Sequence, residues 1–124
     1  MSLTIKKCLK CGALVEVLHD CTCENCGVQC CGEEMRTQLP NTVDAAVEKH
    51  LPVVEVNGNE IVVVVPHVME DDHYIEWIAF ETEKSICKKF FKPGEEAKAK
   101  FPYIPGSKVY EYCNKHGLWS TEVK

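Results

Sequence analysis

Five side chains able to bind a transition metal are grouped in three short segments of the second part of the chain. The segments are Glu48–Pro52, His67–Ile75 and Cys113–Gly117, and they carry four of the five histidines. A single histidine in a strand-rich protein is more often a surface or core residue than a ligand, but this grouping favours one shared site. The candidate donors are His50, His67, His73, Cys113 and His116.

The donor types indicate which metal such a site would hold. Cys113 and His116 are separated by two residues, so a tight turn can bring both to one ion, and Gly117 can relax the backbone just beyond them. Five donors exceed the four that structural zinc normally takes, whereas imidazole with thiolate suits a redox metal such as iron. We therefore predict iron, with zinc as the second choice.

A second set of donors lies near the start of the chain. Seven of the nine cysteines fall between Cys8 and Cys31, and no export signal is visible ahead of them, which favours metal thiolates over a disulfide framework. Cys8-Leu9-Lys10-Cys11-Gly12 has the pattern of a metal-binding knuckle. Because four thiolates on one ion leave no position for another ligand, such a centre would transfer electrons or stabilise a small module, without being catalytic.

The elements that must position these donors are predicted to be strands. Pro52–Val56 and Ile61–Val65 are rich in β-branched residues and flank Asn57-Gly58, which predicts a hairpin. Further predicted strands are Tyr74–Glu81, Ile86–Phe91 and Lys108–Tyr112, while Glu95–Lys100 is assigned to a turn or a strand.

These strands, with turn signals at Pro93-Gly94 and Pro105-Gly106, predict an all-β fold that contains an immunoglobulin-like antiparallel β-sandwich. The three donor segments all lie at predicted strand ends, and Cys113–Gly117 follows the last predicted strand. Because loops converge at one end of a sandwich, donors far apart in the sequence can meet around one ion.

Length and charge limit the remaining possibilities. The 124 residues, 45% hydrophobic, suffice for one compact core behind a small cysteine-rich module, with polar Arg36–Thr42 as a linker. A net charge of -5 argues against a nucleic-acid partner, which requires a basic face. Since no long apolar run or signal-like start occurs, we predict a cytoplasmic protein without membrane association.

The three donor segments resemble the motifs of the desulfoferrodoxin family of superoxide reductases, and they occur in the family's order. The matching residues are Glu48-Lys49-His50, His67-x-Met69-x-x-x-His73-Tyr74-Ile75 and Cys113-Asn114-x-His116-Gly117. Val68 departs from the proline of many relatives, at a position that is not a ligand. By this resemblance, residues 1–37 are a desulforedoxin-like metal module and residues 38–124 a neelaredoxin-like catalytic domain.

The resemblance implies a ligand arrangement for the catalytic iron. The Cys113 thiolate would be axial, and the sixth position would be open in the ferrous enzyme. Four imidazoles would surround the iron, those of His50, His67, His73 and His116.

The resemblance also implies a reaction and its partners. Superoxide would be reduced by one electron and two protons to hydrogen peroxide. Lys49 would attract superoxide and order water for proton delivery, and Glu48 would help to displace the product. Rubredoxin or a similar electron carrier would re-reduce the iron, and members of the family are commonly homodimers.

The cysteine-rich head resembles desulforedoxin less completely. Cys30–Met35 is similar to the second half of that module, which implies an iron centre, or a zinc centre, held by Cys8, Cys11, Cys30 and Cys31. The chain departs from the module at Cys21, Cys23 and Cys26, so a ligand set that uses one or two of these three stays open, as does a disulfide or a second metal site among them.

Two other residues and two other functions complete the predictions. Isolated Cys87 is typical of a small buried hydrophobe, and His19 of a loop residue. The alternatives to a reductase are an iron electron-transfer protein without an open catalytic position and a zinc-stapled binding module. A superoxide dismutase is a closer rival because it shares the substrate, but it needs no external electron donor.

Overall fold

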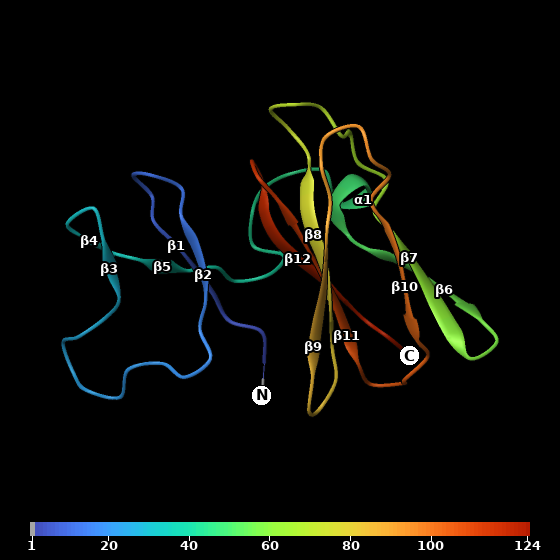
Figure 1. Cartoon of the computed structure of the whole chain (residues 1–124), viewed down its shortest axis with the longest axis horizontal. Helices are drawn as coiled ribbons and strands as arrows, with labels where there is room; N and C mark the ends of the chain where they lie inside the picture. Colours follow the sequence, from blue (N-terminus) through green and yellow to red (C-terminus); the bar gives the residue numbers. More distant parts are fainter. Residues whose placement is uncertain (1) are drawn as a thin grey trace. The chain divides into compact units, whose positions relative to one another are not determined.

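The computed structural model describes residues 2–124, which form two compact units, Ser2–Leu39 and Pro40–Lys124 (Figure 1). Almost all regular structure in both units is β-strand, and every strand pair is antiparallel. Within residues 2–124 no helix is long and apolar enough to cross a membrane.

The first unit, here called the head, consists of two small sheets. One has the order β2-β1-β5, and the other is a hairpin of β3 and β4. The strands are β1 (Ile5–Lys7), β2 (Leu14–Glu16), β3 (Gln29–Cys30), β4 (Glu33–Glu34) and β5 (Arg36–Thr37). The apolar residues buried in this unit are Leu3, Ile5, Cys8 and Met35. A core of this size is too small to stabilise a module without further cross-links.

The predicted linker at Arg36–Thr42 was partly wrong. Arg36 and Thr37 pair with Lys7 and Lys6 of β1, so the start of this segment belongs to the head's sheet. Backbone pairing stabilises a strand whatever the polarity of its exposed side chains, so the polar residue types of this segment did not indicate the pairing.

The second unit is a sandwich of two antiparallel sheets, as predicted from the strand pattern. The three-stranded sheet has the order β10-β7-β6 and the four-stranded sheet β12-β11-β8-β9. The strands are β6 (Val53–Asn57), β7 (Glu60–Val64), β8 (Ile75–Glu81), β9 (Ile86–Phe90), β10 (Lys98–Pro102), β11 (Lys108–Cys113) and β12 (Gly117–Glu122).

The core between the two sheets follows from alternating apolar residues. Ile61 and Val63 of β7 are fully buried, as are Ile78 of β8 and Val109 of β11. Across the sandwich, the rings of Phe80 and Phe101 stack with centroids 4.9 Å apart. The predicted hairpin is confirmed, since Asn57 pairs with Glu60 around Gly58 at φ 64, a left-handed conformation that glycine adopts without strain.

Three features near the donor segments differ from the predicted pattern. A short helix, α1 (Val47–His50), precedes β6, and β12 follows the segment that was expected to end the strands. Lys98–Pro102 is a strand, which resolves the turn-or-strand assignment. Cys87 is exposed on β9, so its prediction as a buried hydrophobe was wrong, because β9 is the edge strand of its sheet and has a neighbouring strand on one side only.

A buried carboxylate makes the sandwich sensitive to pH. Glu111 of β11 is fully buried, pairs with Ile78 and Trp119 on the adjacent strands, and neither of its carboxylate oxygens has a hydrogen-bond partner. Burial raises the pKa of Glu111 from 4.5 to about 9. Between these values the folded protein keeps a proton that the unfolded chain has released, so stability falls as pH rises through this window.

Glu111→Gln should therefore stabilise the protein at pH 8, by a few kcal/mol at about 1.4 kcal/mol per unit of pKa shift, because glutamine has the same shape and does not ionise. Urea unfolding of both proteins at pH 5.5 and pH 8, at equal iron content, measures the effect. Equal pH slopes for the two proteins would contradict it.

Candidate metal centre

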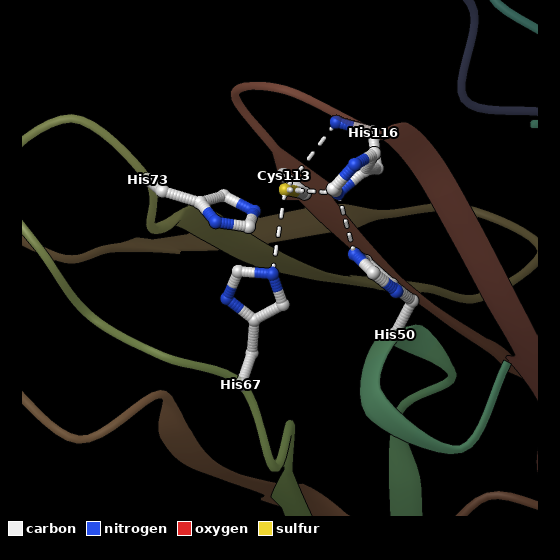
Figure 2. Close-up of side chains that lie close together, drawn as sticks. All are labelled: His50, His67, His73, Cys113 and His116. Atoms are coloured by element: carbon white, nitrogen blue, oxygen red, sulfur yellow. Dashed lines mark hydrogen bonds between the residues drawn. The ribbon is translucent and has the colours of Figure 1, made fainter. Parts of the chain in front are cut away.

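The five predicted donors of the second unit, here called the histidine–cysteine group, converge at one end of the sandwich, and four of them lie at or within two residues of the end of a helix or strand. His50 ends α1, His67 lies between β7 and β8, and His73 lies two residues before β8. Cys113 ends β11, and His116 immediately precedes β12. Their donor atoms all lie within 4.8 Å of one another (Figure 2).

The four imidazoles form a closed ring of neighbours. The centroid distances are 4.8 Å for His50–His67, 4.5 Å for His67–His73, 5.0 Å for His73–His116 and 4.8 Å for His116–His50. All four contacts are edge-on, with interplanar angles from 66° to 88°. Rings in this arrangement direct nitrogens to a common centre, as Figure 2 shows.

Backbone carbonyls select which nitrogen of two rings faces that centre. His50 Nδ1 lies 2.7 Å from the carbonyl oxygen of Ala46, and His67 Nδ1 lies 2.6 Å from that of Val68. A nitrogen that close to a carbonyl carries the proton, so Nε2 of each ring presents a lone pair. Metal-binding histidines commonly have their second nitrogen held in this way.

The rings of His73 and His116 complete the set. His116 presents Nδ1, which lies 3.1 Å from His50 Nε2 and 3.7 Å from Cys113 Sγ. His73 Nε2 is buried and has no hydrogen-bond partner. A buried nitrogen without a hydrogen-bond partner raises the free energy of the folded protein. A cation bound between these nitrogens and the sulfur would remove that cost, so these residues fit a bound metal.

Burial favours the neutral form of the rings. It lowers the pKa of His67 and of His116, and the other histidines of the ring lower both further by charge repulsion. Neutral imidazole is the form that binds a metal, because protonation removes the lone pair.

The sulfur is the most deeply buried donor. Cys113 is fully buried, and its Sγ lies 3.5 Å from His67 Nε2 and accepts a hydrogen bond from the backbone N–H of His116 at 3.4 Å. Burial raises the pKa of the Cys113 thiol, so the thiolate needs a nearby cation to form. The β8–β11 register shifts beside the sulfur: Tyr112 pairs with Trp77 and Cys113 with Ile75, so the extra residue of this irregularity lies on β8.

Two residues that support the site were missed or given no role. Trp119 stacks on His50 with centroids 5.0 Å apart and donates from Nε1 to the carbonyl oxygen of His116 at 3.1 Å. The Asn114 side chain accepts from Tyr74 N–H and donates to the Asp72 carbonyl, which ties the loop before β8 to the β11–β12 turn. Asn114 belongs to the Cys113–Gly117 motif, but no feature of the sequence indicated a role for Trp119.

Glu48 and Lys49 are both exposed on α1, directly before His50. Their backbone position is therefore fixed by the same short helix that positions a donor. Successive residues of a helix project in different directions, so Glu48 and Lys49 leave α1 in directions different from that of His50.

The head contains a second set of donors, here called the four-cysteine group, in which the sulfurs lie within 4.8 Å of one another. Its members are Cys8, Cys11, Cys30 and Cys31. Cys11 Sγ lies 3.6 Å from Cys30 Sγ. Neighbouring cysteines normally point to opposite sides of a strand, but Cys31 has φ 54, a left-handed turn that lets both sulfurs converge.

The ionisation of these thiols also fits a bound cation. The backbone N–H of Cys11 lowers the pKa of Cys8 to about 7. Hydrogen bonding to the sulfurs of Cys11 and Cys8 raises the pKa of Cys30 to about 12, because the protonated thiol is the form that donates. A bound divalent or trivalent ion would favour the thiolate instead. The histidine–cysteine group and the four-cysteine group both have the donor chemistry of iron-binding sites.

The three additional cysteines of the head lie outside both donor groups. Cys23 and Cys26 form a disulfide, and Cys21 is an exposed free thiol. The structure therefore groups the preferred four cysteines and places none of the alternatives Cys21, Cys23 and Cys26 among them. His19 is exposed in the same loop, as predicted.

Comparison with known proteins gives consistent matches. The family model described as Desulfoferrodoxin matches residues 42–122. Two proteins named Desulfoferrodoxin, from Syntrophotalea carbinolica and Nitratidesulfovibrio vulgaris, are each 45% identical to the chain. The match covers 97% of this chain and 96% of the first protein, and 96% of this chain and 95% of the second.

Solved structures agree with these relatives. The superoxide reductase from Treponema pallidum is 33% identical with a TM-score of 0.72, over 98% of this chain and 100% of that one. The superoxide reductase from Giardia intestinalis is 25% identical with a TM-score of 0.52, over 60% of this chain and 95% of that one. With a family model that matches most of its length and relatives that align end to end, the chain belongs to the desulfoferrodoxin family.

Proposed function

We propose that this chain is an enzyme, a superoxide reductase that converts superoxide to hydrogen peroxide at a mononuclear iron. The observation that carries the proposal is the convergence of four imidazoles and one buried thiol within 4.8 Å. Structures of superoxide reductases from two organisms share the fold. The residues that would hold the iron are His50, His67, His73, Cys113 and His116.

Iron bound there would supply one electron to superoxide, which with two protons gives hydrogen peroxide. The protein's own residues prepare the site for this chemistry. The Ala46 and Val68 carbonyls keep two rings in the tautomer that presents Nε2 inward. The backbone N–H of His116 donates to Cys113 Sγ and would offset part of the charge of a thiolate there, which would donate electron density to a bound metal.

The exposed residues before His50 would handle substrate and product. Lys49 would raise the local concentration of superoxide and order water for proton delivery, although the chain carries a net charge of -5. Exposed charges are screened beyond about 8 Å at physiological salt, so a lysine next to a donor outweighs distant carboxylates. Glu48 would help to displace the product.

The head would carry a separate centre. We infer that Cys8, Cys11, Cys30 and Cys31 hold an iron, or a zinc, in a desulforedoxin-like module spanning residues 1–37, ahead of the catalytic domain at residues 38–124. Four sulfur donors leave no position for oxygen chemistry, so this centre would stabilise the head or carry electrons. A small carrier such as rubredoxin would re-reduce the catalytic iron, in a cytoplasmic homodimer.

The reaction itself is the first test. The pre-reduced protein should consume superoxide in a single turnover with formation of peroxide and without release of oxygen, which distinguishes a reductase from a dismutase. Cys113→Ser should slow this step by more than about a hundred-fold, beyond the usual cost of losing an outer-shell partner of a metal. Pulse radiolysis measures both, with iron content determined in parallel. Full activity of the iron-loaded Cys113→Ser protein would refute the assignment of the sulfur.

Lys49→Ala should lower the second-order rate with superoxide by about ten-fold and weaken its dependence on ionic strength, because steering by a single nearby charge is screened by salt. Lys84→Ala is the matched control, since Lys84 is an exposed lysine in the turn after β8, at the other end of that strand from His73. Identical rates and salt slopes for the two variants would remove the steering role.

Loss of the head's metal should leave catalysis intact. Cys30→Ser removes a sulfur from the four-cysteine group, which lies entirely in the first unit, while all five donors of the histidine–cysteine group lie in the second. Iron content should fall by one ion per chain, or one zinc should be lost, with the rate of superoxide reduction unchanged. A parallel fall in that rate would show that the two centres depend on each other.

A further inference from the structure

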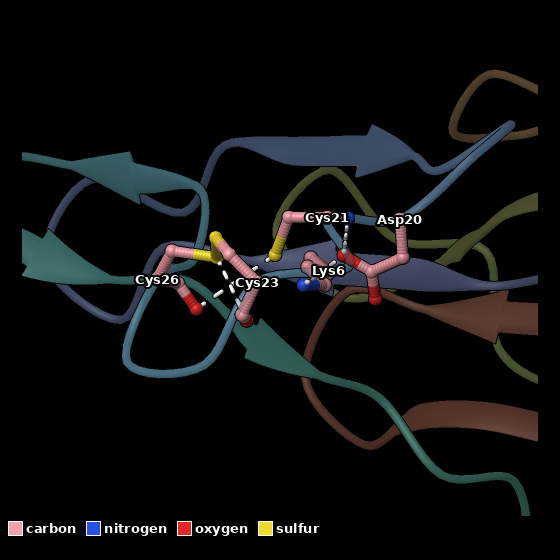
Figure 3. Close-up of polar contacts among 5 residues, drawn as sticks. All are labelled: Lys6, Asp20, Cys21, Cys23 and Cys26. Atoms are coloured by element: carbon pink, nitrogen blue, oxygen red, sulfur yellow. Dashed lines mark hydrogen bonds and ion pairs between the residues drawn. A yellow bond between two sulfur atoms is a disulfide. The ribbon is translucent and has the colours of Figure 1, made fainter.

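The loop between β2 and β3 carries three cysteines that belong to neither donor group. Residues 17–28 form no strand or helix, and every residue from Cys21 to Cys26 is exposed. Cys23 and Cys26 are joined by a disulfide across three positions of sequence, and Cys21 is a free thiol (Figure 3). Thiol chemistry is thus concentrated in one accessible segment.

The disulfide is poorly suited to a purely structural role. The stabilisation from a cross-link grows with the length of the loop that it closes, and the Cys23–Cys26 ring is among the shortest a chain can form. The same unit is already held by the β2-β1-β5 sheet and by the four-cysteine group. Exposed disulfides are the ones that tend to be labile or catalytic.

An ion pair between a buried lysine and a half-exposed aspartate holds the backbone of Cys21 beside this disulfide. Lys6, nearly buried with 7% of its side chain exposed, binds Asp20 Oδ1 at 3.1 Å. The same oxygen accepts a hydrogen bond from the backbone N–H of Cys21 at 2.8 Å. Cys21 Sγ donates to the carbonyl oxygen of Cys26 at 3.7 Å, a contact that Figure 3 shows as a dashed line.

We propose that Cys21, Cys23 and Cys26 form a thiol–disulfide exchange site whose substrate is an accessible dithiol of a partner protein. A partner thiolate attacks one sulfur of the Cys23–Cys26 bond, forms a mixed disulfide and releases the other cysteine as a thiolate. The partner's second thiol then attacks the partner's own sulfur in the mixed disulfide. This forms the partner's disulfide and releases the remaining cysteine of this chain as a thiolate. Cys23 and Cys26 gain two electrons and two protons, and the partner dithiol becomes a disulfide, so the exchange needs no further oxidant or reductant.

The short ring explains why the substrate is a dithiol. After attack by a monothiol, the released cysteine stays close to the mixed disulfide and expels the monothiol, which restores the original bond. A dithiol escapes this reversal because its second thiol is also tethered nearby. Cys21 supplies a further internal nucleophile, whose attack on Cys26 Sγ would give a Cys21–Cys26 disulfide and a free Cys23 thiol.

The test uses the full-length, iron-loaded protein, reduced anaerobically with ascorbate so that the irons take up no further electrons. The probe is thioredoxin with its NADPH-dependent reductase, and glutathione at equal thiol concentration is the monothiol comparison. Alkylation followed by peptide mass measurement should show Cys23 and Cys26 opening at least about ten-fold faster with thioredoxin, with one NADPH consumed per chain. Iron content should stay constant throughout.

Two variants give the controls. Cys26→Ser should consume no NADPH, and Cys87→Ser, which removes an exposed cysteine on β9, should behave as the parent protein. If the disulfide opens only after denaturation, its role is structural. If thioredoxin and glutathione open it at equal rates, the bond is accessible but has no preference for a dithiol. A third metal ion per chain, lost in Cys26→Ser, would identify a metal site. Each of these three results overturns the proposal.

The part assigned to Cys21 is tested separately. In Cys23→Ser, mild oxidation should join Cys21 to Cys26, as non-reducing peptide mapping would show. Two free thiols after oxidation would remove Cys21 from the site and reduce the proposal to the Cys23–Cys26 pair.

Discussion

The second unit is organised around a cluster of inward-facing imidazole nitrogens and one buried sulfur. Nε2 of His50 and of His67 face inward because the opposite nitrogens are committed to backbone carbonyls, and His73 Nε2 is buried without a partner. A buried sulfur completes the set at Cys113. Such an arrangement is unfavourable in the polypeptide alone, and a cation at its centre converts it into a stable site.

The sandwich supplies the rigidity that this cluster requires. Antiparallel sheets bring strand ends from distant parts of the chain together at one end of the sandwich. The turns there can hold metal donors close to one another. Trp119 packs against His50 on its far side, so that donor is held by stacking as well as by its hydrogen bond.

The head also uses clustered metal donors, but there they compensate for a small hydrophobic core. Its few buried apolar residues cannot stabilise the unit Ser2–Leu39, and four clustered sulfurs allow a metal to do so. The Cys21–Cys26 loop lies outside that arrangement and is anchored through Asp20 and Lys6. A four-sulfur metal-binding group and an exposed disulfide therefore occur in one small unit. The disulfide is open to thiols from solvent, whereas sulfurs bound to a metal would not be.

The sequence alone determined the donor types, the all-β class and the hairpin around Gly58, because ligand identity and alternation are properties of short segments. It placed the donor segments next to strands, but it did not predict the short helix that carries His50. The tertiary structure decided which imidazole nitrogen faces inward and that Trp119 supports His50. It also decided that Cys87 is exposed and that Cys23 pairs with Cys26 apart from the other four sulfurs. Most of these outcomes depend on contacts between residues far apart in the chain. The grouping of the four sulfurs also depends on the left-handed turn at Cys31, a conformation that a cysteine in the sequence does not predict.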